Sequence, residues 1–169
     1  DNQYPSGLFT SSARGSTGNA GNLTINTQKL FVRDGAQVGT NTFGTSKGGN
    51  LNVTANTVEV TGTSADNHYA SGLLASSERG STGNAGDLTI NTQQLLVRDG
   101  AQVGSATFGT GKGGNLNVTA DTVEVTGTSA DNQYPSGLFT SSQAGSTGNA
   151  GDLTINTQQL LVGNGARIT

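Results

Sequence analysis

The sequence predicts an all-β protein with the fold of a right-handed parallel β-helix, and three observations support this prediction. The chain has 169 residues and repeats with a period of 65, so that residues 1–4 recur in closely similar form at 66–69 and 131–134. Apolar and polar residues alternate within short runs, which is the pattern of strands with one buried face. Gly, Asn, Asp and Ser separate these runs, and no segment has a helical period. Short strands of this kind bury their apolar faces only when successive turns stack.

Each repeat contains two turns. The segment that starts at Gly21 resembles segments starting at Gly49, Gly86, Gly114 and Gly151, and the starts are 28, 37, 28 and 37 residues apart. A short turn therefore alternates with a long one. We expect a single β-helical segment over 1–169, made of units 1–65, 66–130 and a partial unit 131–169. Because the chain starts and ends within a turn, we expect it to be a fragment of a longer shaft.

Each turn is predicted to have three strands, and stacking of equivalent turns aligns their aliphatic side chains in inward columns. Right-handed winding follows from the preferred hand of parallel crossovers. Val38, Leu8, Val103, Leu73 and Leu138 indicate the third wall. The core columns of the first two walls are Leu23, Leu51, Leu88, Leu116 and Leu153; Ile25, Val53, Ile90, Val118 and Ile155; Leu30, Val58, Leu95, Val123 and Leu160; and Val32, Val60, Val97, Val125 and Val162.

Two outward columns have a recognisable chemistry. At one corner, Asn22, Asn50, Asp87, Asn115 and Asp152 are expected to form hydrogen bonds along the axis. On the second wall, Phe31, Leu96 and Leu161 alternate with glutamates and form a candidate lateral stripe for contact with another molecule. The alternative is that they are isolated exposed apolar residues, which are common on protein surfaces.

The long turns contain an insertion between Thr61 and Gly72 that must leave the stack. One such loop would project every two turns, about 9.6 Å from the next. Loops on a rigid scaffold often make functional contacts. The candidate contact residues are Tyr4, Pro5, His68, Tyr69, Tyr134 and Pro135. The alternative is that each tyrosine packs against the stack and anchors its own loop.

Composition and motifs argue against several functions. Charged residues make up 11% of the chain and the net charge is −3, so no basic patch for nucleic acid is expected. No apolar run is long enough to insert in a membrane. There is no cysteine, and His68 is the single histidine. Glycine-rich matches to nucleotide-binding loops lack the required helix or lysine. We therefore predict no enzyme activity and no catalytic, cofactor-binding or metal-binding residues.

Several strings resemble the repeats of filamentous-haemagglutinin-type large exoproteins, the secreted partners of two-partner secretion, in the form abundant in cyanobacteria. They are Gly-Asn-Ala-Gly-Asn-Leu-Thr-Ile-Asn-Thr-Gln at 18–28, Val-Arg-Asp-Gly-Ala-Gln-Val at 32–38 and Gly-Gly-Asn-Leu-Asn-Val at 48–53. The resemblance covers essentially the whole chain. It implies a long right-handed β-helical shaft, exported through an outer-membrane partner, that serves adhesion, aggregation or extracellular matrix formation.

The function expected from these observations is that of a structural or adhesive fibre segment, extracellular or at the cell surface. Expected partners are further copies of the chain, arranged end to end or in lateral bundles, or the rest of one continuous shaft, together with cell-surface glycans. The resemblance adds the outer-membrane secretion partner. Two alternatives stay open: a glycan-binding or ice-binding β-helical module and, less favoured, an enzyme similar to polysaccharide lyases.

Overall fold

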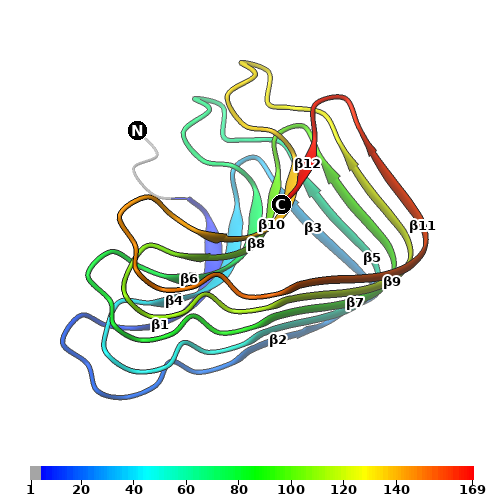
Figure 1. Ribbon diagram of the computed structural model, residues 1–169. Coiled ribbons are helices and arrows are strands. Elements are labelled where there is room, and N and C mark those ends of the chain that lie inside the picture. The colour runs from blue at the N-terminus through cyan, green and yellow to red at the C-terminus, as the bar shows by residue number, and fades with distance from the viewer. Residues whose placement is uncertain (1–4) are drawn as a thin grey trace.

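A computed structural model describes residues 5–169, and this part of the chain contains twelve β-strands and no helix (Figure 1). One sheet contains only short strands, and the other contains the four longest strands together with two short ones. The short strands are β1 (Gly7–Ser12), β4 (Gln37–Thr42), β6 (Gly72–Ser77), β8 (Gln102–Thr107), β10 (Gly137–Ser142) and β12 (Arg167–Ile168). The other sheet contains β2 (Leu23–Asn26), β3 (Lys29–Arg33), β5 (Leu51–Thr61), β7 (Leu88–Arg98), β9 (Leu116–Thr126) and β11 (Leu153–Gly163).

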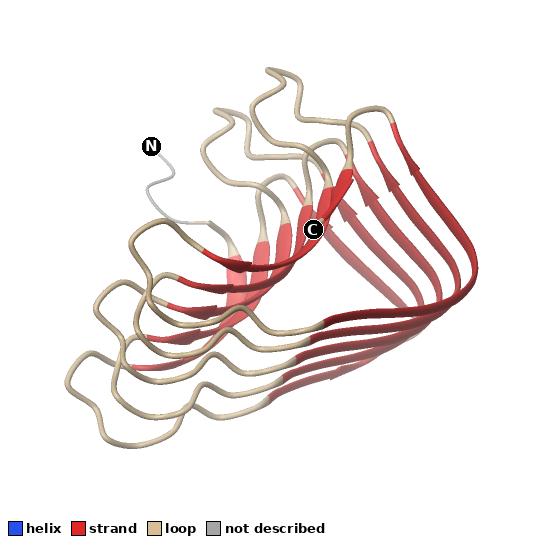
Figure 2. Ribbon diagram, viewed as in Figure 1, coloured by secondary structure: helices blue, strands red, loops and turns tan. Residues whose placement is uncertain are grey.

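Every ladder in both sheets is parallel, and the chain passes alternately from one sheet to the other. The first sheet has the order β1-β4-β6-β8-β10-β12. The second has the order β11-β9-β7-β5-β2, and β3 also pairs with β5. Successive turns therefore lie one above another, with their loops gathered at the edges of the stack (Figure 2). The prediction of an all-β parallel solenoid is confirmed.

The first two predicted strands of a turn are one continuous strand in most turns. Strands β5, β7, β9 and β11 each have 11 residues and bend near the middle (Figure 1). Pairing between β5 and β7 is interrupted at the bend for one residue and resumes in the same register, since Ala55 pairs with Thr92 and Thr57 with Gln94. Only the first turn is divided, into β2 and β3. The structure therefore has two strands per turn in most turns, where the sequence predicts three.

Equivalent aliphatic residues pair in register through the stack. Leu51, for example, pairs with Leu88, and Leu88 pairs with Leu116. All three are fully buried. The outermost turns pack against a neighbour on one side only, so Leu160 and Val162 in β11 are 50% and 43% exposed. The core is thus a set of aliphatic columns that run along the axis.

The interior of the first sheet becomes polar where its strands end. Thr107 is fully buried and its Oγ1 donates a 2.6 Å hydrogen bond to the carbonyl of Gly111. Ser77 Oγ donates likewise to the carbonyl of Gly83 at 2.7 Å. These hydroxyls satisfy loop carbonyls that would otherwise be buried without a partner. The hydroxyls at the ends of β6 and β8 therefore fasten the loops that follow these two strands.

The predicted corner column forms hydrogen bonds along the axis. Asn50 Oδ1 accepts the backbone N–H of Asp87 at 3.0 Å, and Asp87 Oδ1 accepts that of Asn115 at 2.8 Å. The same bond joins Asn22 to Asn50 and Asn115 to Asp152, in both cases at 2.8 Å. Each side chain thus satisfies a backbone donor in the next turn, and Asn and Asp serve equally because only the oxygen is used.

Candidate binding surfaces

Two loops project from one edge of the stack, between β5 and β6 and between β9 and β10 (Figure 1). Each is closed by an antiparallel bridge, Thr63 to Ala70 in the first loop and Thr128 to Pro135 in the second. The short connections between β3 and β4 and between β7 and β8 contain no such loop. Projecting loops therefore occur on alternate turns, as the alternation of 28 and 37 residues predicts.

The tip of each projecting loop is organised by a serine and an aspartate. In the first loop, Ser64 Oγ donates a 2.6 Å hydrogen bond to Asp66, and the same oxygen accepts the N–H of Tyr69 at 3.0 Å. The hydrogen bonds of Ser64 and His68 to Asp66 lower the pKa of this carboxyl to about 2. The second loop repeats the arrangement with Ser129, Asp131 and Tyr134, and the pKa of Asp131 is also lowered, chiefly by Ser129. The loop tips are therefore preorganised by hydrogen bonds within each loop.

The base of each projecting loop is fastened to the short connection of the preceding turn. The N–H of Gly35 donates to Ser71 Oγ at 3.0 Å, and the N–H of Gly100 donates to Ser136 Oγ at 2.9 Å. Both serines are fully buried. Gly35 also lies so close to Ser64 that an added Cβ would be 2.7 Å from the Ser64 Cβ. The loops are thus held rigidly on the scaffold.

The candidate contact residues occupy different positions on these loops. His68 is exposed at the first tip, 3.1 Å from Asp66, while Tyr69 and Tyr134 are half-buried. Pro135 closes the second loop and Pro5 is partly buried at the start of the described chain. Tyr4 lies outside the described residues. Because Tyr69 and Tyr134 are half-buried, each is compatible with both predicted roles, anchoring of its own loop and contact with another molecule.

The candidate lateral stripe is interrupted at its centre. Phe31 and Leu161 are 50% and 56% exposed, whereas Leu96 is only 8% exposed. Leu96 pairs with Glu59 on one side and Glu124 on the other. Glu124 receives two hydrogen bonds from Arg98, at 3.0 and 2.8 Å. Long charged side chains cover neighbouring apolar surface with their methylene groups, so no continuous apolar strip is formed.

The outer face of the first sheet carries a feature that our sequence analysis missed. Phe9, Leu74 and Phe139 point outward on alternate turns, and glycines pair with them on the turns between, namely Gly39 and Gly104. A Cβ at Gly104 would lie 2.8 Å from the ring of Phe139. The glycine therefore provides the space in which the ring rests.

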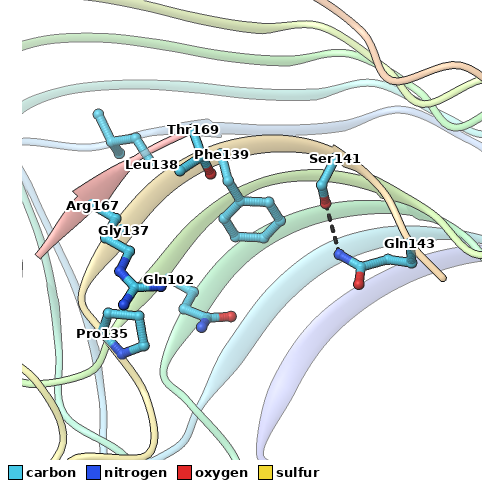
Figure 3. Close-up of a pocket in the computed structure, with 9 residues that line it drawn as sticks. All are labelled: Gln102, Pro135, Gly137, Leu138, Phe139, Ser141, Gln143, Arg167 and Thr169. Atoms are coloured by element: carbon cyan, nitrogen blue, oxygen red, sulfur yellow. Dashed lines mark hydrogen bonds between the residues drawn. The ribbon is translucent and has the colours of Figure 1, made fainter.

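Phe139 borders a hollow of about 250 Å³ on this face. Figure 3 shows its ring between Gln102, Arg167 and Pro135 on one side and Ser141 and Gln143 on the other. The amide of Gln143 donates a 2.8 Å hydrogen bond to Ser141. The Phe139 ring can pack against the apolar face of a ligand ring. The surrounding amides and the guanidinium can form hydrogen bonds to hydroxyl groups at the edge of that ligand ring.

A signal for this column exists in the sequence. Strict alternation would place a polar residue after each inward Leu8, Leu73 and Leu138, but the next residue is Phe or Leu every time. The intermediate turns have glycine at the equivalent place, after Val38 and Val103. A pair of large apolar residues on one turn thus alternates with a valine–glycine pair on the next. This pattern indicates an outward apolar side chain that has no side chain directly above or below it.

No protein-family model, curated protein or solved structure matches this chain. Across residues 5–169, no helix has the length and apolar character needed to cross a membrane. The same residues contain no group of three or more His, Cys, Asp or Glu side chains placed to hold a metal ion.

Proposed function

We propose that this chain is a segment of an extracellular or cell-surface fibre, in which a right-handed, three-sided β-helical shaft holds loops at regular intervals for adhesion, aggregation or matrix formation. The observation that carries the proposal is the parallel, in-register pairing of equivalent residues between successive described turns. The proposed role requires no catalysis.

The arrangement of hydrogen bonds suits a mechanical role. Strands lie across the axis, so their backbone hydrogen bonds, about 4.8 Å apart, run along it. The corner bonds from Asn50 to Asp87 and from Asp87 to Asn115 follow the same direction. A load along the shaft is thus shared by many parallel bonds in every layer. Such a stack also propagates by addition of further turns, because each turn contacts only its neighbours.

The surfaces available for adhesion are displayed at a fixed spacing. Projecting loops and outward apolar residues both recur every two turns, which corresponds to about 9.6 Å. The proposed partners are neighbouring turns of a continuous shaft or further copies, and cell-surface glycans. The resemblance to filamentous-haemagglutinin-type repeats supports export through an outer-membrane partner.

Cryo-electron microscopy of the native material tests this proposal. We expect filaments with layer lines near 4.8 Å and 9.6 Å, from stacked strands and from the two-turn repeat respectively. Material boiled in denaturant and imaged in the same way is the control, because it should lose both spacings. Short discrete particles without axial periodicity in the native material would contradict the fibre proposal.

A further inference from the structure

A second hollow, of about 170 Å³, lies on the loop edge opposite the projecting loops. Its walls come from the connections that follow β1, β4 and β6, and its lining includes Arg14, Phe43, Thr45 and Arg79. We call it the Arg14–Arg79 hollow. It contains none of the candidate contact residues that the sequence indicates, and it is separate from the Phe139 hollow.

Both arginines are at the tips of hydrogen-bonded turns. The N–H of Ser16 donates to the carbonyl of Ala13 at 3.1 Å, and the N–H of Ser81 donates to that of Glu78 at 3.0 Å. Gly15 and Gly80 follow the arginines with φ values of 76° and 80°, which type II turns require at that position. The turns are two levels apart, so the two arginine backbones are separated by about 9.6 Å along the axis.

Neither guanidinium group has an ion-pair partner in the part of the chain that the structure describes. Arg33 and Arg98 are paired with Glu59 and Glu124, but Arg14 and Arg79 have no carboxylate partner among residues 5–169. The acidic residue nearest to Arg79 in the sequence is Glu78, which directly precedes it. Its carboxyl is bonded to Ser76 and its pKa is raised by burial. Two cations thus border one hollow without a compensating charge in its lining.

Phe43 lies between the two arginine turns and is half-buried. The hollow is open above it, because a Cβ added at Gly15 or at Gly80 would meet no atom within 4 Å. Below it, Gly44 allows the first turn to approach closely, since a Cβ there would lie 2.7 Å from the carbonyl oxygen of Ser16. The aromatic surface and both cations are therefore accessible from the same side.

We propose that the Arg14–Arg79 hollow binds an acidic polysaccharide, with a sugar ring against Phe43 and uronate carboxylates on the two arginines. Aromatic side chains pack against apolar ring faces, and guanidinium forms paired hydrogen bonds to carboxylate. Because the two arginine turns are about 9.6 Å apart along the axis, the ligand must carry two anionic groups separated by roughly the length of a disaccharide. The inference gives a ligand class to the adhesive role proposed above and rests on that role.

The chain contains its own control for this site. One repeat further on, Phe108 and Arg79 recur as the equivalents of Phe43 and Arg14, but Ala144 replaces the second arginine. The turn itself is kept, since Ser146 N–H donates to the carbonyl of Gln143 at 2.9 Å and Gly145 has a φ of 86°. The structure therefore assigns one complete site to this chain. It also indicates that Ala at the turn tip is compatible with folding.

Isothermal titration calorimetry of the dispersed 169-residue chain with tetragalacturonate tests the inference. We expect one site per chain, and binding of uncharged galactotetraose at least about tenfold weaker because it lacks the carboxylates. Arg14→Ala and Arg79→Ala should each weaken binding about tenfold, and Phe43→Ala should weaken it as well. Lys29→Ala, which removes an exposed cation from another wall, should have no effect. Ala144→Arg added to Arg14→Ala should restore binding, because Arg79, Phe108 and the new arginine would form an equivalent hollow one repeat further on.

Several outcomes would overturn the inference. They are no binding by the parent chain, equal loss in Lys29→Ala and Arg79→Ala, or no recovery of binding when Ala144→Arg is added to Arg14→Ala. Equal binding of tetraglutamate that is insensitive to Phe43→Ala would indicate an acidic peptide site instead. Tighter binding of a sulfated tetrasaccharide would exclude carboxylate as the recognised group. Because the assay uses dispersed chains, its result is independent of filament formation, so failure of the fibre proposal and failure of this site are distinguishable.

Discussion

At the scale of single residues, backbone contact between turns determines where glycine is required. Gly49, Gly86, Gly114 and Gly151 form a column at one corner of the stack. A Cβ on Gly114 would lie 1.8 Å from the carbonyl oxygen of Gly86, and a Cβ on Gly86 would lie 1.9 Å from that of Gly49. No side chain fits this distance, so an added methyl group must push two turns apart. Gly21 begins the same column and has no atom in the way.

This difference predicts that the same substitution destabilises the protein at Gly114 and has little effect at Gly21. Gly114→Ala should lower the free energy of unfolding by about 1–3 kcal/mol, since overpacking forces the backbone to shift. Gly21→Ala is the matched control and should change it by less than about 1 kcal/mol, because alanine there also restricts the unfolded chain. Urea denaturation followed by circular dichroism measures both. Equal destabilisation by the two substitutions would show that close approach is not the reason for the column.

The serine–aspartate pair of each projecting loop has a consequence for pH dependence. The pKa of Asp66 is lowered to about 2 from 3.8, first by the hydrogen bond of Ser64. A lowered folded-state pKa stabilises the fold above the unfolded-state value, and this stabilisation is lost as the pH falls from 3.8 towards 2. The contribution of Asp66 to the free energy of unfolding should therefore decline below about pH 4, while the loop tip keeps its hydrogen bonds until the pH approaches 2.

Carbon-detected NMR titration of the carboxyl groups tests the origin of this shift. Ser64→Ala should raise the pKa of Asp66 towards its ordinary value, because the largest cause of the lowering is removed. Asp131, whose pKa is lowered chiefly by Ser129, is the internal control and should not change. An unchanged pKa of Asp66 in the variant would assign the shift to the neighbouring His68 instead.

At the scale of elements, each short strand of the first sheet has an apolar beginning and a polar end. In β8, Val103 lies in the core, while Thr107 at the end of the strand donates to the carbonyl of Gly111. The strand thus stabilises both the core and the loop that follows it. The long strands have no such division, because their inward residues are aliphatic on both sides of the bend.

The buried hydroxyl predicts a specific cost for an isosteric change. Thr107→Val should lower the free energy of unfolding by about 1–3 kcal/mol, since the carbonyl of Gly111 would lose its donor in a buried position. Thr107→Ser keeps the donor and is the control, with an expected loss that is clearly smaller. Thermal unfolding of the two variants distinguishes them. A Val variant as stable as the Ser variant would mean that the hydroxyl does not fasten the loop.

At the scale of the whole molecule, the alternation of two turn lengths gives the stack a period of two turns. Projecting loops, outward apolar residues and the arginine turns all follow this period, while the core columns repeat in every turn. Surface features can therefore vary without disturbance of the core, as the replacement of Arg79 by Ala144 at the equivalent turn illustrates. The filament layer lines expected above are the direct measure of this double periodicity.

Strict internal repetition made most of the fold predictable. The alternation around Leu23 and Ile25 predicts strands, and the spacings of 28 and 37 residues predict which residues pair. The joining of the first two predicted strands into one bent strand was not predictable in this way. The register is the same on both sides of the corner, at Ala55 and at Thr57, and a strand that bends with the loss of so few pairs has no sequence signal comparable to a glycine-rich turn.

The sequence by itself determined the β class, the parallel stacking, the core columns and the position of the projecting loops, because a repeated chain must place equivalent residues in equivalent surroundings. Only the tertiary structure decided what those surroundings are. In the folded protein, Leu96 is buried beside the Arg98–Glu124 pair, and the ring of Phe139 lies over Gly104. Arg14, Phe43 and Arg79 line one hollow. These contacts join residues that are adjacent along the axis but tens of positions apart in the chain, so their side-chain packing and not their periodicity determines the surface.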